Sequence, residues 1–250
     1  MKVILEKPVI FKTIIEILGE FTKDVKLVFE KEQITIHAIS TNVAFIEFKL
    51  SRKMFSKYEL EGEKEEVDIS LTDLKGIVSK VGPTDVFTMM VKDNQLYCVT
   101  MGKRKKVFRM GLLSEDVEIK PLDLSKFQPK NSVTLPIVDF NDTVNDFDAK
   151  ITAVKIKLEE DKLIMFIDDA DITTKMSIEI KKATDVKINK VEELVACKLN
   201  ISYLKSIQKI SRIATKLKWN LEKDTPSIFI VNVPDKFEMK YLVAPMIENE

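Results

Sequence analysis

Residues 25–34 read VKLVFEKEQI and residues 154–163 read VKIKLEEDKL, so one apolar alternation followed by a charged turn occurs twice. Two shorter pairs keep nearly the same spacing, KPVIF with LPIVD and LKGI with LKSI, at residues 7–11, 135–139, 74–77 and 204–207. Each match is weak by itself, but the offset between the two members is nearly the same in all three pairs. The sequence therefore predicts two copies of one unit of roughly 110 residues.

Hydrophobic periodicity predicts the order strand, helix, three strands, helix, three strands in each copy. In the first copy, Pro8 should open a helix, and Thr72 or Asp73 should cap a second one that Gly82-Pro83 ends. The residues expected to face inward are Val9, Ile10, Ile14, Ile17, Leu18 and Phe21, then Leu74, Ile77, Val78 and Val81. Strands are expected near residues 2–6, 25–30, 33–39, 43–50, 85–91, 95–101 and 104–111, with an Asp93-Asn94 turn.

The second copy is predicted to have helices at residues 136–147 and 201–210 and final strands near 214–221, 227–233 and 236–243. The helices should bury Ile137, Phe140, Val144 and Phe147, then Ile201, Leu204, Ile207 and Ile210. The fold class is therefore α+β. We expect one domain at residues 1–112, a connector at 113–130 and a second domain at 131–250. Several apolar residues make the connector too hydrophobic for a solvated linker, so it should lie on a domain surface.

The composition excludes several classes of protein. The 250 residues include 40 Lys+Arg, 40 Asp+Glu and 45% hydrophobic residues, so a packed core is expected. No run of 18 apolar residues occurs, and the two cysteines form no disulfide framework, so an intracellular setting is expected. Only six glycines are present, and they fit neither of the common nucleotide-binding loops.

No combination of residues predicts catalysis. The one histidine, His37, lies in a strand-like run, and Cys98 and Cys197 are expected to be buried small hydrophobes. Residues 168–171 read DDAD, which lacks the glycine and terminal glutamate of a calcium loop and is typical of a charged turn. We therefore expect a protein that is not an enzyme and has no metal and no cofactor.

The neutral total conceals charge segregation. Residues 194–221 carry six positive side chains and no negative one. Among them Lys205, Lys209 and Arg212 have the spacing of one helix face, which favours contact with a phosphate backbone or, alternatively, a solvated lysine face. A second basic run at residues 103–109 is typical of a nucleic-acid patch, of a lysine-protected edge strand, or of a strand that pairs with an acidic edge.

The end of the chain carries the most specific family likeness. Residues 240–248 read KYLVAPMIE, and ISYLK at 201–205 and LSRKMFSKY at 50–58 accompany it. Together with the repeated βαβββαβββ unit and the long connector, these segments resemble the DNA sliding clamps of the proliferating cell nuclear antigen (PCNA) family. The resemblance covers the whole chain.

The resemblance implies a ring of three protomers, with helices on the inner face and sheets outside. Such a ring encircles duplex DNA without sequence specificity and tethers DNA polymerase and repair proteins, after a clamp loader opens it. The chain would work in DNA replication and repair, in the cytoplasm or nucleoid, or in a nucleus. The alternatives are a subunit of a hetero-oligomeric or checkpoint-type clamp, a viral processivity factor with fewer subunits, and a DNA-modifying enzyme or non-DNA scaffold with the same fold.

The resemblance also implies three groups of site residues. DNA would contact Lys12, Lys75, Lys80, Lys205, Lys209, Arg212 and Lys216. A short hydrophobic partner peptide, with its glutamine and plug, would bind near Val43, Phe45, Leu122, Leu124, Pro226, Leu242, Ala244 and Pro245. Ring closure would pair residues 103–110 with residues 170–179 of the next protomer, through Lys103, Arg104, Lys105, Lys106, Arg109, Asp171, Thr173 and Lys175.

Two features depart from the family pattern. Gly19 and Gly76 stand where a lysine is usual. The outer face of the 136–147 helix carries Asp139, Asp142 and Asp146 instead of arginines, and these carboxylates would repel a duplex. Either the DNA runs tilted and contacts the other helices, or the chain is a divergent paralogue in a mixed ring.

Overall fold

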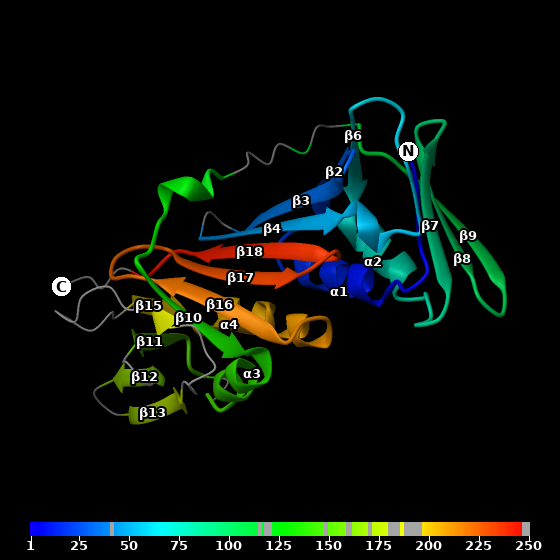
Figure 1. Ribbon diagram of the computed structural model, residues 1–250. Coiled ribbons are helices and arrows are strands. Elements are labelled where there is room, and N and C mark those ends of the chain that lie inside the picture. The colour runs from blue at the N-terminus through cyan, green and yellow to red at the C-terminus, as the bar shows by residue number, and fades with distance from the viewer. Residues whose placement is uncertain are drawn as a thin grey trace. The chain divides into compact units, whose positions relative to one another are not determined.

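The computed structural model describes residues 1–40, 43–114, 117, 122–147, 150–158, 162–169, 172–179, 186–187 and 197–246 (Figure 1). The chain divides into two compact units. Unit 1 comprises residues 1–40, 46–121 and 232–239, and unit 2 comprises residues 41–45, 122–231 and 240–250. Each unit therefore takes a short segment from the opposite end of the chain. The predicted division of the chain at residues 112 and 130 stays a prediction.

Unit 1 contains two helices and strands from two antiparallel sheets. The first sheet has the strand order β5-β1-β7-β8-β9, and β4, β3, β2 and β6 follow one another in the second. The helices are α1 (Val9–Leu18) and α2 (Leu71–Val78), which pack side by side (Figure 1). The strands are β1 (Lys2–Leu5), β2 (Asp24–Glu30), β3 (Gln33–Ser40), β4 (Ala44–Ser51), β5 (Lys57–Glu59), β6 (Lys64–Ser70), β7 (Val86–Lys92), β8 (Gln95–Met101) and β9 (Lys105–Gly111), and the 3₁₀ helix η1 covers Arg52–Met54.

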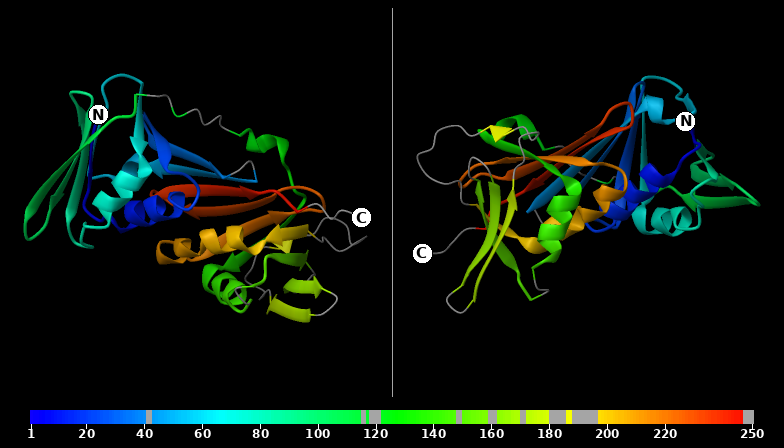
Figure 2. Two further views of the ribbon diagram at one scale, coloured as in Figure 1. Left: turned by 180° about the vertical axis from the view of Figure 1, so that it is seen from behind. Right: turned by 60° about the horizontal axis from the view of Figure 1, so that its bottom comes forward.

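Unit 2 repeats this plan with the orders β14-β10-β16-β17-β18 and β13-β12-β11-β15. Its helices are α3 (Ile137–Asn145), α4 (Ile201–Ser206) and the 3₁₀ helices η2 (Leu124–Lys126) and η3 (Gln208–Arg212). Figure 2 shows these elements from two further sides. The strands of this second copy are β10 (Asn131–Pro136), β11 (Ala153–Leu158), β12 (Lys162–Asp169), β13 (Ile172–Glu179), β14 (Val186–Lys187), β15 (Cys197–Asn200), β16 (Lys216–Leu221), β17 (Ser227–Val233) and β18 (Phe237–Val243). Residues 232–233 of β17 and 237–239 of β18 are counted with unit 1.

The sheet orders confirm the repeat predicted from the sequence. Strands β1–β9 of the first copy correspond in chain order to strands β10–β18 of the second. With this correspondence, the two strand orders of unit 1 become the two strand orders of unit 2. Helix α1 begins at Val9 and its counterpart α3 at Ile137, while α2 begins at Leu71 and its counterpart α4 at Ile201. The two helix pairs are therefore separated by nearly equal lengths of chain, and the α+β fold class is confirmed.

Buried apolar stripes hold each helix against its sheets. Leu74, Ile77, Val78 and Val81 are buried as predicted, and so are all eight inward residues expected for α3 and the 201–210 segment. Aromatic side chains fill the centre of unit 2, where the tilted rings of Trp219 and Phe229 have centroids 4.6 Å apart and Phe140 meets Trp219 edge-on. Within the described residues, no helix is both long and apolar enough to cross a bilayer.

The structure corrects several predicted details. Val9 does not face inward but is 41% exposed, and Ile10 and Phe21 are only half-buried, because Phe11 and Ile15 take the inward positions of α1. Ser70 caps α2 instead of Thr72 or Asp73, and its hydroxyl oxygen accepts a hydrogen bond from the Asp73 backbone N–H at 3.2 Å.

The predicted strand count of the first copy was too low. Strand β6 pairs with β2 along seven residues, and short β5 pairs with β1, although neither was predicted. Strand β6 reads KEEVDIS, and its charged residues obscure the alternation that buries only Val67 and Ile69. The second copy also holds the unpredicted strands β14 and β15. The helix expected at residues 201–210 ends as an α-helix at Ser206 and continues as η3.

Candidate nucleic-acid and partner interfaces

The helix pair of unit 1 carries three of the predicted DNA contacts. Lys12 is half-buried on α1, and its Nζ donates a hydrogen bond to the Ser79 carbonyl at the end of α2, at 3.4 Å. Lys80 is exposed just beyond α2, and its Nζ lies 5.3 Å from the centre of the Phe108 ring. A basic group over an aromatic face gains about 0.5–1 kcal/mol at an exposed site and becomes oriented.

The Lys75 side chain occupies the space beside Gly19, and Gly19 stands where a lysine is usual in the family that the sequence resembles. A β-carbon placed on Gly19 would lie 3.2 Å from the Lys75 Nζ, so the side chain of α2 crosses the end of α1. The same Nζ lies 4.0 Å from the Glu20 carboxylate. Lys75 thus supplies a positive group at the position where Gly19 supplies none.

The basic segment of unit 2 is an α-helix followed by a tighter turn. Asn200 caps α4 by accepting a hydrogen bond from the Ser202 N–H, at 2.9 Å. Lys205 lies on α4, whereas Lys209 and Arg212 lie on η3. Residues three apart eclipse on a 3₁₀ helix, so Lys209 and Arg212 share a face even though the predicted α-helical spacing is interrupted. Arg212 is exposed, as is Lys216 at the start of β16.

The acidic helix α3 packs directly beside this basic segment. Two amide side chains link α3 to η3. Asn141 Nδ2 donates to the Gln208 carbonyl at 3.1 Å, and Gln208 Nε2 donates to the Asn141 carbonyl at 3.2 Å. Gln208 Nε2 also donates to Asn145 Oδ1 at 3.0 Å. We call these contacts the amide clasp. It fixes the acidic face and the basic face of unit 2 next to each other.

The predicted carboxylates of α3 lie on its outer side. Asp142 and Asp146 are exposed, Asp139 is half-buried, and Val138 beside them is 62% exposed. None of the three carboxylates makes an ion pair within the part of the chain that the structure describes. The repulsion expected from the sequence is therefore present on the surface and is not cancelled by a neighbouring lysine in these residues.

All eight residues predicted for the peptide pocket belong to unit 2. The Ala244 N–H donates to the Val43 carbonyl at 2.8 Å and so joins two segments from opposite ends of the chain. Phe45 and Leu242 are 3% and 5% exposed and can act only as a floor. Leu122 is 38% exposed, and Val43, Leu124, Pro226, Ala244 and Pro245 are half-buried.

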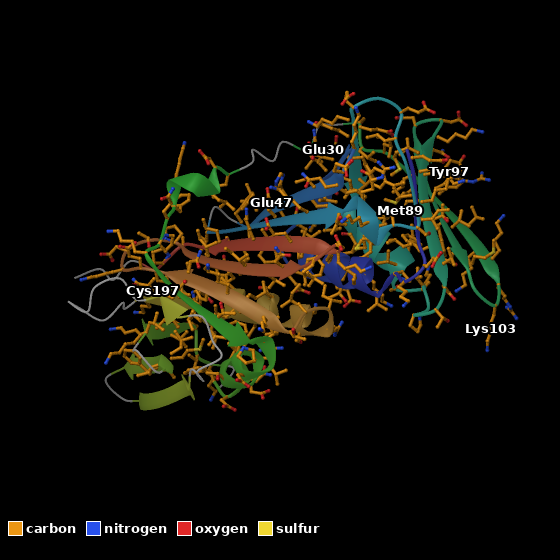
Figure 3. The ribbon with its side chains drawn as sticks, viewed as in Figure 1. Glu30, Glu47, Met89, Tyr97, Lys103 and Cys197 are labelled. Carbon is orange, nitrogen blue, oxygen red and sulfur yellow. The ribbon has the colours of Figure 1, made fainter. Side chains whose placement is uncertain are left out.

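The strands predicted to close a ring lie at sheet edges. Strand β9 is the last in the order β5-β1-β7-β8-β9, and β13 ends the order β13-β12-β11-β15 (Figures 1 and 2). Lys103, Arg104, Lys105, Lys106 and Arg109 are all exposed on β9 and the turn before it, where Figure 3 labels Lys103. Val107 on β9 is 49% exposed and Met101 at the end of the neighbouring strand β8 is 52% exposed, and exposed apolar side chains near a sheet edge are typical of an interface.

The other half of the predicted contact is only partly described. Thr173 and Lys175 lie on β13, and Asp171 lies outside the described residues. Asp168 and Asp169 end strand β12, where Asp169 pairs with Ile172, and the other two residues of the turn predicted at 168–171 lie outside the described residues. Sequence reasoning missed Tyr97, whose ring lies 5.4 Å from the Arg109 guanidinium carbon. The hairpin register that pairs these two residues could have indicated this contact.

His37, Cys98 and Cys197, whose side-chain types are common in catalytic sites, lie in surroundings typical of structural residues. His37 Nε2 lies 2.8 Å from the Glu47 carboxylate, and this hydrogen bond is the main cause that lowers the pKa of the Glu47 carboxyl. Burial raises the pKa of the Cys98 thiol to about 12 and that of Cys197 to about 11, so neither forms a thiolate readily. No cluster of metal-ligating side chains occurs among the described residues.

Comparison with known proteins assigns the family. Residues 1–126 match the family described as proliferating cell nuclear antigen, N-terminal domain. The chain belongs to the PCNA family. The DNA polymerase sliding clamp of Nanoarchaeum equitans is 23% identical over 238 residues, or 94% of each chain. That of Thermococcus fumicolans is 26% identical over 222 residues, or 87% of each. The crystal structure of the Entamoeba histolytica PCNA superimposes with a TM-score of 0.83 at 18% identity and covers 98% of each chain.

Proposed function

We propose that this PCNA-family chain is a DNA sliding clamp, a ring that encircles duplex DNA and tethers DNA polymerase and other replication and repair proteins. The observation that carries the proposal is family membership together with a repeat that extends through both units. Relatives that are matched over 87–94% of their length are named as sliding clamps. The proposed role requires no chemistry of the chain's own, as expected for a clamp that works by tethering.

DNA binding is proposed for the basic helix faces. Lys12, Lys75 and Lys80 serve unit 1, and Lys205, Lys209, Arg212 and Lys216 serve unit 2. Contacts of lysine and arginine with phosphates do not depend on base sequence, as a clamp that slides requires. Because the carboxylates of α3 would repel DNA, we propose that the duplex contacts the other helical elements instead.

Ring closure is proposed between β9 of one copy and β13 of the next. A head-to-tail contact between two different edges closes into a ring when the rotation between copies is right. The basic side chains at residues 103–106 serve this contact rather than DNA. The chain should then have a solution mass of about three times 28.7 kDa. Light scattering measures this mass, and a monomer at micromolar concentration would overturn a ring of identical copies.

A polymerase extension assay tests the function itself. On a primed circular template, the chain with its clamp loader should lengthen the product made in one binding event, because a tethered polymerase does not diffuse away. The matched control omits only the clamp. Products of equal length with and without the chain would contradict the proposed function.

A further inference from the structure

Strand β9 carries its basic side chains on two different faces of the sheet. Residues directly opposite one another in an antiparallel pair lie on the same face. Lys106 pairs with Thr100, which is fully buried, whereas Lys105 pairs with Met101, which is 52% exposed. Lys106 therefore lies on the inner face of the sheet, on the side of the core of unit 1, and Lys105 lies on the outer face.

From this inner face the Lys106 side chain reaches the end of helix α2. Its Nζ donates a hydrogen bond to the Lys80 carbonyl at 3.1 Å. The last carbonyls of a helix have no partner within the helix, and the negative end of the helix dipole attracts a positive group. Lys106 therefore supplies a partner that α2 itself lacks, and it fixes the backbone of Lys80.

The side chain of Lys80 returns to the same strand. Its Nζ lies 5.3 Å from the centre of the ring of Phe108, which is two residues beyond Lys106 and thus on the same face of β9. Neither lysine forms an ion pair within the residues that the structure describes. A lysine that is already held in one direction loses less side-chain entropy when it binds a phosphate.

The turn that follows α2 packs closely on the turn between β8 and β9. The Asp85 carboxylate accepts a hydrogen bond from the Gly82 N–H at 2.9 Å. A β-carbon placed on Gly102 would lie 1.9 Å from Asp85 Oδ1, so only glycine permits this approach. The end of α2 and the start of β9 are therefore held together by contacts that do not involve Lys80 or Lys106.

We propose that Lys106 is a positioning residue for DNA binding. It does not touch the duplex, but it holds Lys80 in the direction in which Lys80 contacts a phosphate. The inference rests on the proposed function and deepens it, because it separates Lys106 from the rest of the basic run. Lys105 and Arg109, on the outer face of β9, remain available for ring closure.

A double-mutant cycle on duplex affinity tests the inference. Methionine resembles lysine in length and has no charge and no donor. Lys80→Met should weaken binding of a short duplex about fivefold at low salt and reduce the salt slope by roughly 0.9. Lys106→Met should weaken binding about threefold. The double variant should lose only about fivefold, because Lys106 acts through Lys80, whereas independent contacts would multiply to about fifteenfold. Fluorescence anisotropy at several salt concentrations measures these affinities.

Three further variants separate positioning from net charge and from ring closure. Lys106→Arg keeps a donor and should keep the affinity of the unchanged chain. Lys92→Met removes the same charge at the exposed end of β7 and should have no effect. Lys105→Met should make the ring dissociate at lower salt in light scattering, while Lys106→Met should leave the mass unchanged.

Three outcomes would overturn the inference. Losses that multiply in the double variant would show that Lys106 acts independently of Lys80. A lower mass for Lys106→Met with unchanged duplex affinity would assign Lys106 to ring closure. Unchanged affinity of Lys80→Met would remove both lysines from the DNA site, while the basic face of unit 2 and the proposed function would still stand or fall by their own variants.

Discussion

The helix layers of the two units share one backbone plan and differ in their charge. In unit 1, lysines and acids are mixed on α1 and α2, as in the contact of Lys75 with Glu20. In unit 2, the signs are separated, with carboxylates on α3 and basic groups on α4 and η3. The apolar stripes of both units are buried in the same way. The comparison teaches that burial maintains the repeat, while the charges on its outer face vary independently.

The strongest test of the comparison removes one aromatic side chain from each core. Phe11 in unit 1 and Phe229 in unit 2 are 1% and 0% exposed, so Phe11→Ala and Phe229→Ala should each cost about 3–5 kcal/mol of unfolding free energy. Urea denaturation measures both. A cost below about 1 kcal/mol for either variant would show that the two cores do not contribute alike.

The next test reverses the basic charges of unit 2. The triple variant Lys205→Glu/Lys209→Glu/Arg212→Glu should weaken duplex binding about a hundredfold or more and reduce the salt slope by roughly 0.9 for each lost phosphate contact. Titrations at several salt concentrations measure both quantities. Lys31→Glu/Lys92→Glu/Lys223→Glu, at exposed strand turns, is the control of equal charge. Unchanged binding by the first variant would remove this helix face from the DNA site.

A smaller effect is expected from the amide clasp, which exists only in unit 2 among the described residues. Gln208→Ala removes two hydrogen bonds to α3 and should cost about 1–2 kcal/mol of unfolding free energy. Gln95→Ala, at an exposed position of β8, is the control. Equal stability of both variants would show that the clasp does not hold the acidic and basic faces together.

The smallest effect concerns the acidic face itself. Asp142→Asn/Asp146→Asn removes two exposed carboxylates and should strengthen duplex binding about threefold at low salt, with the gain fading as salt screens it. Asp93→Asn/Asp224→Asn changes the same charge in turns between strands. A similar gain from both variants would mean that only net charge matters and not the position of α3.

The sequence predicted the fold wherever burial alone determines an element. Leu74, Ile77 and Phe140 follow helical spacing and are buried, and the Asp93-Asn94 turn adopts φ values of 51° and 55°. The change from α-helix to 3₁₀ helix near Ile207 was not predictable, since no glycine or proline marks it. Tertiary hydrogen bonds from Gln208 accompany it instead. The Ser70 cap could have been found, because Ser70 lies three residues before Asp73.

The candidate sites were less predictable from the sequence than the fold was. Residues 43, 244 and 245 were grouped through the family resemblance, because nothing local to Val43 indicates a contact with Ala244. The pairing of Lys155 on β11 with Lys198 on β15 was not predicted, since these two residues meet only through strand register. Charge runs within one segment can be recognised in a sequence, whereas charges that converge from separate strands require the sheet order.

Topological retention on DNA tests the clamp assignment most directly. The chain is loaded onto a nicked circular plasmid and moved to salt that screens phosphate contacts, and the bound fraction is measured before and after a single restriction cut. A ring that encircles the duplex should remain on the circle and leave within minutes after linearisation, because it slides off the free ends. Equal loss from circular and linear DNA would contradict the encircling ring.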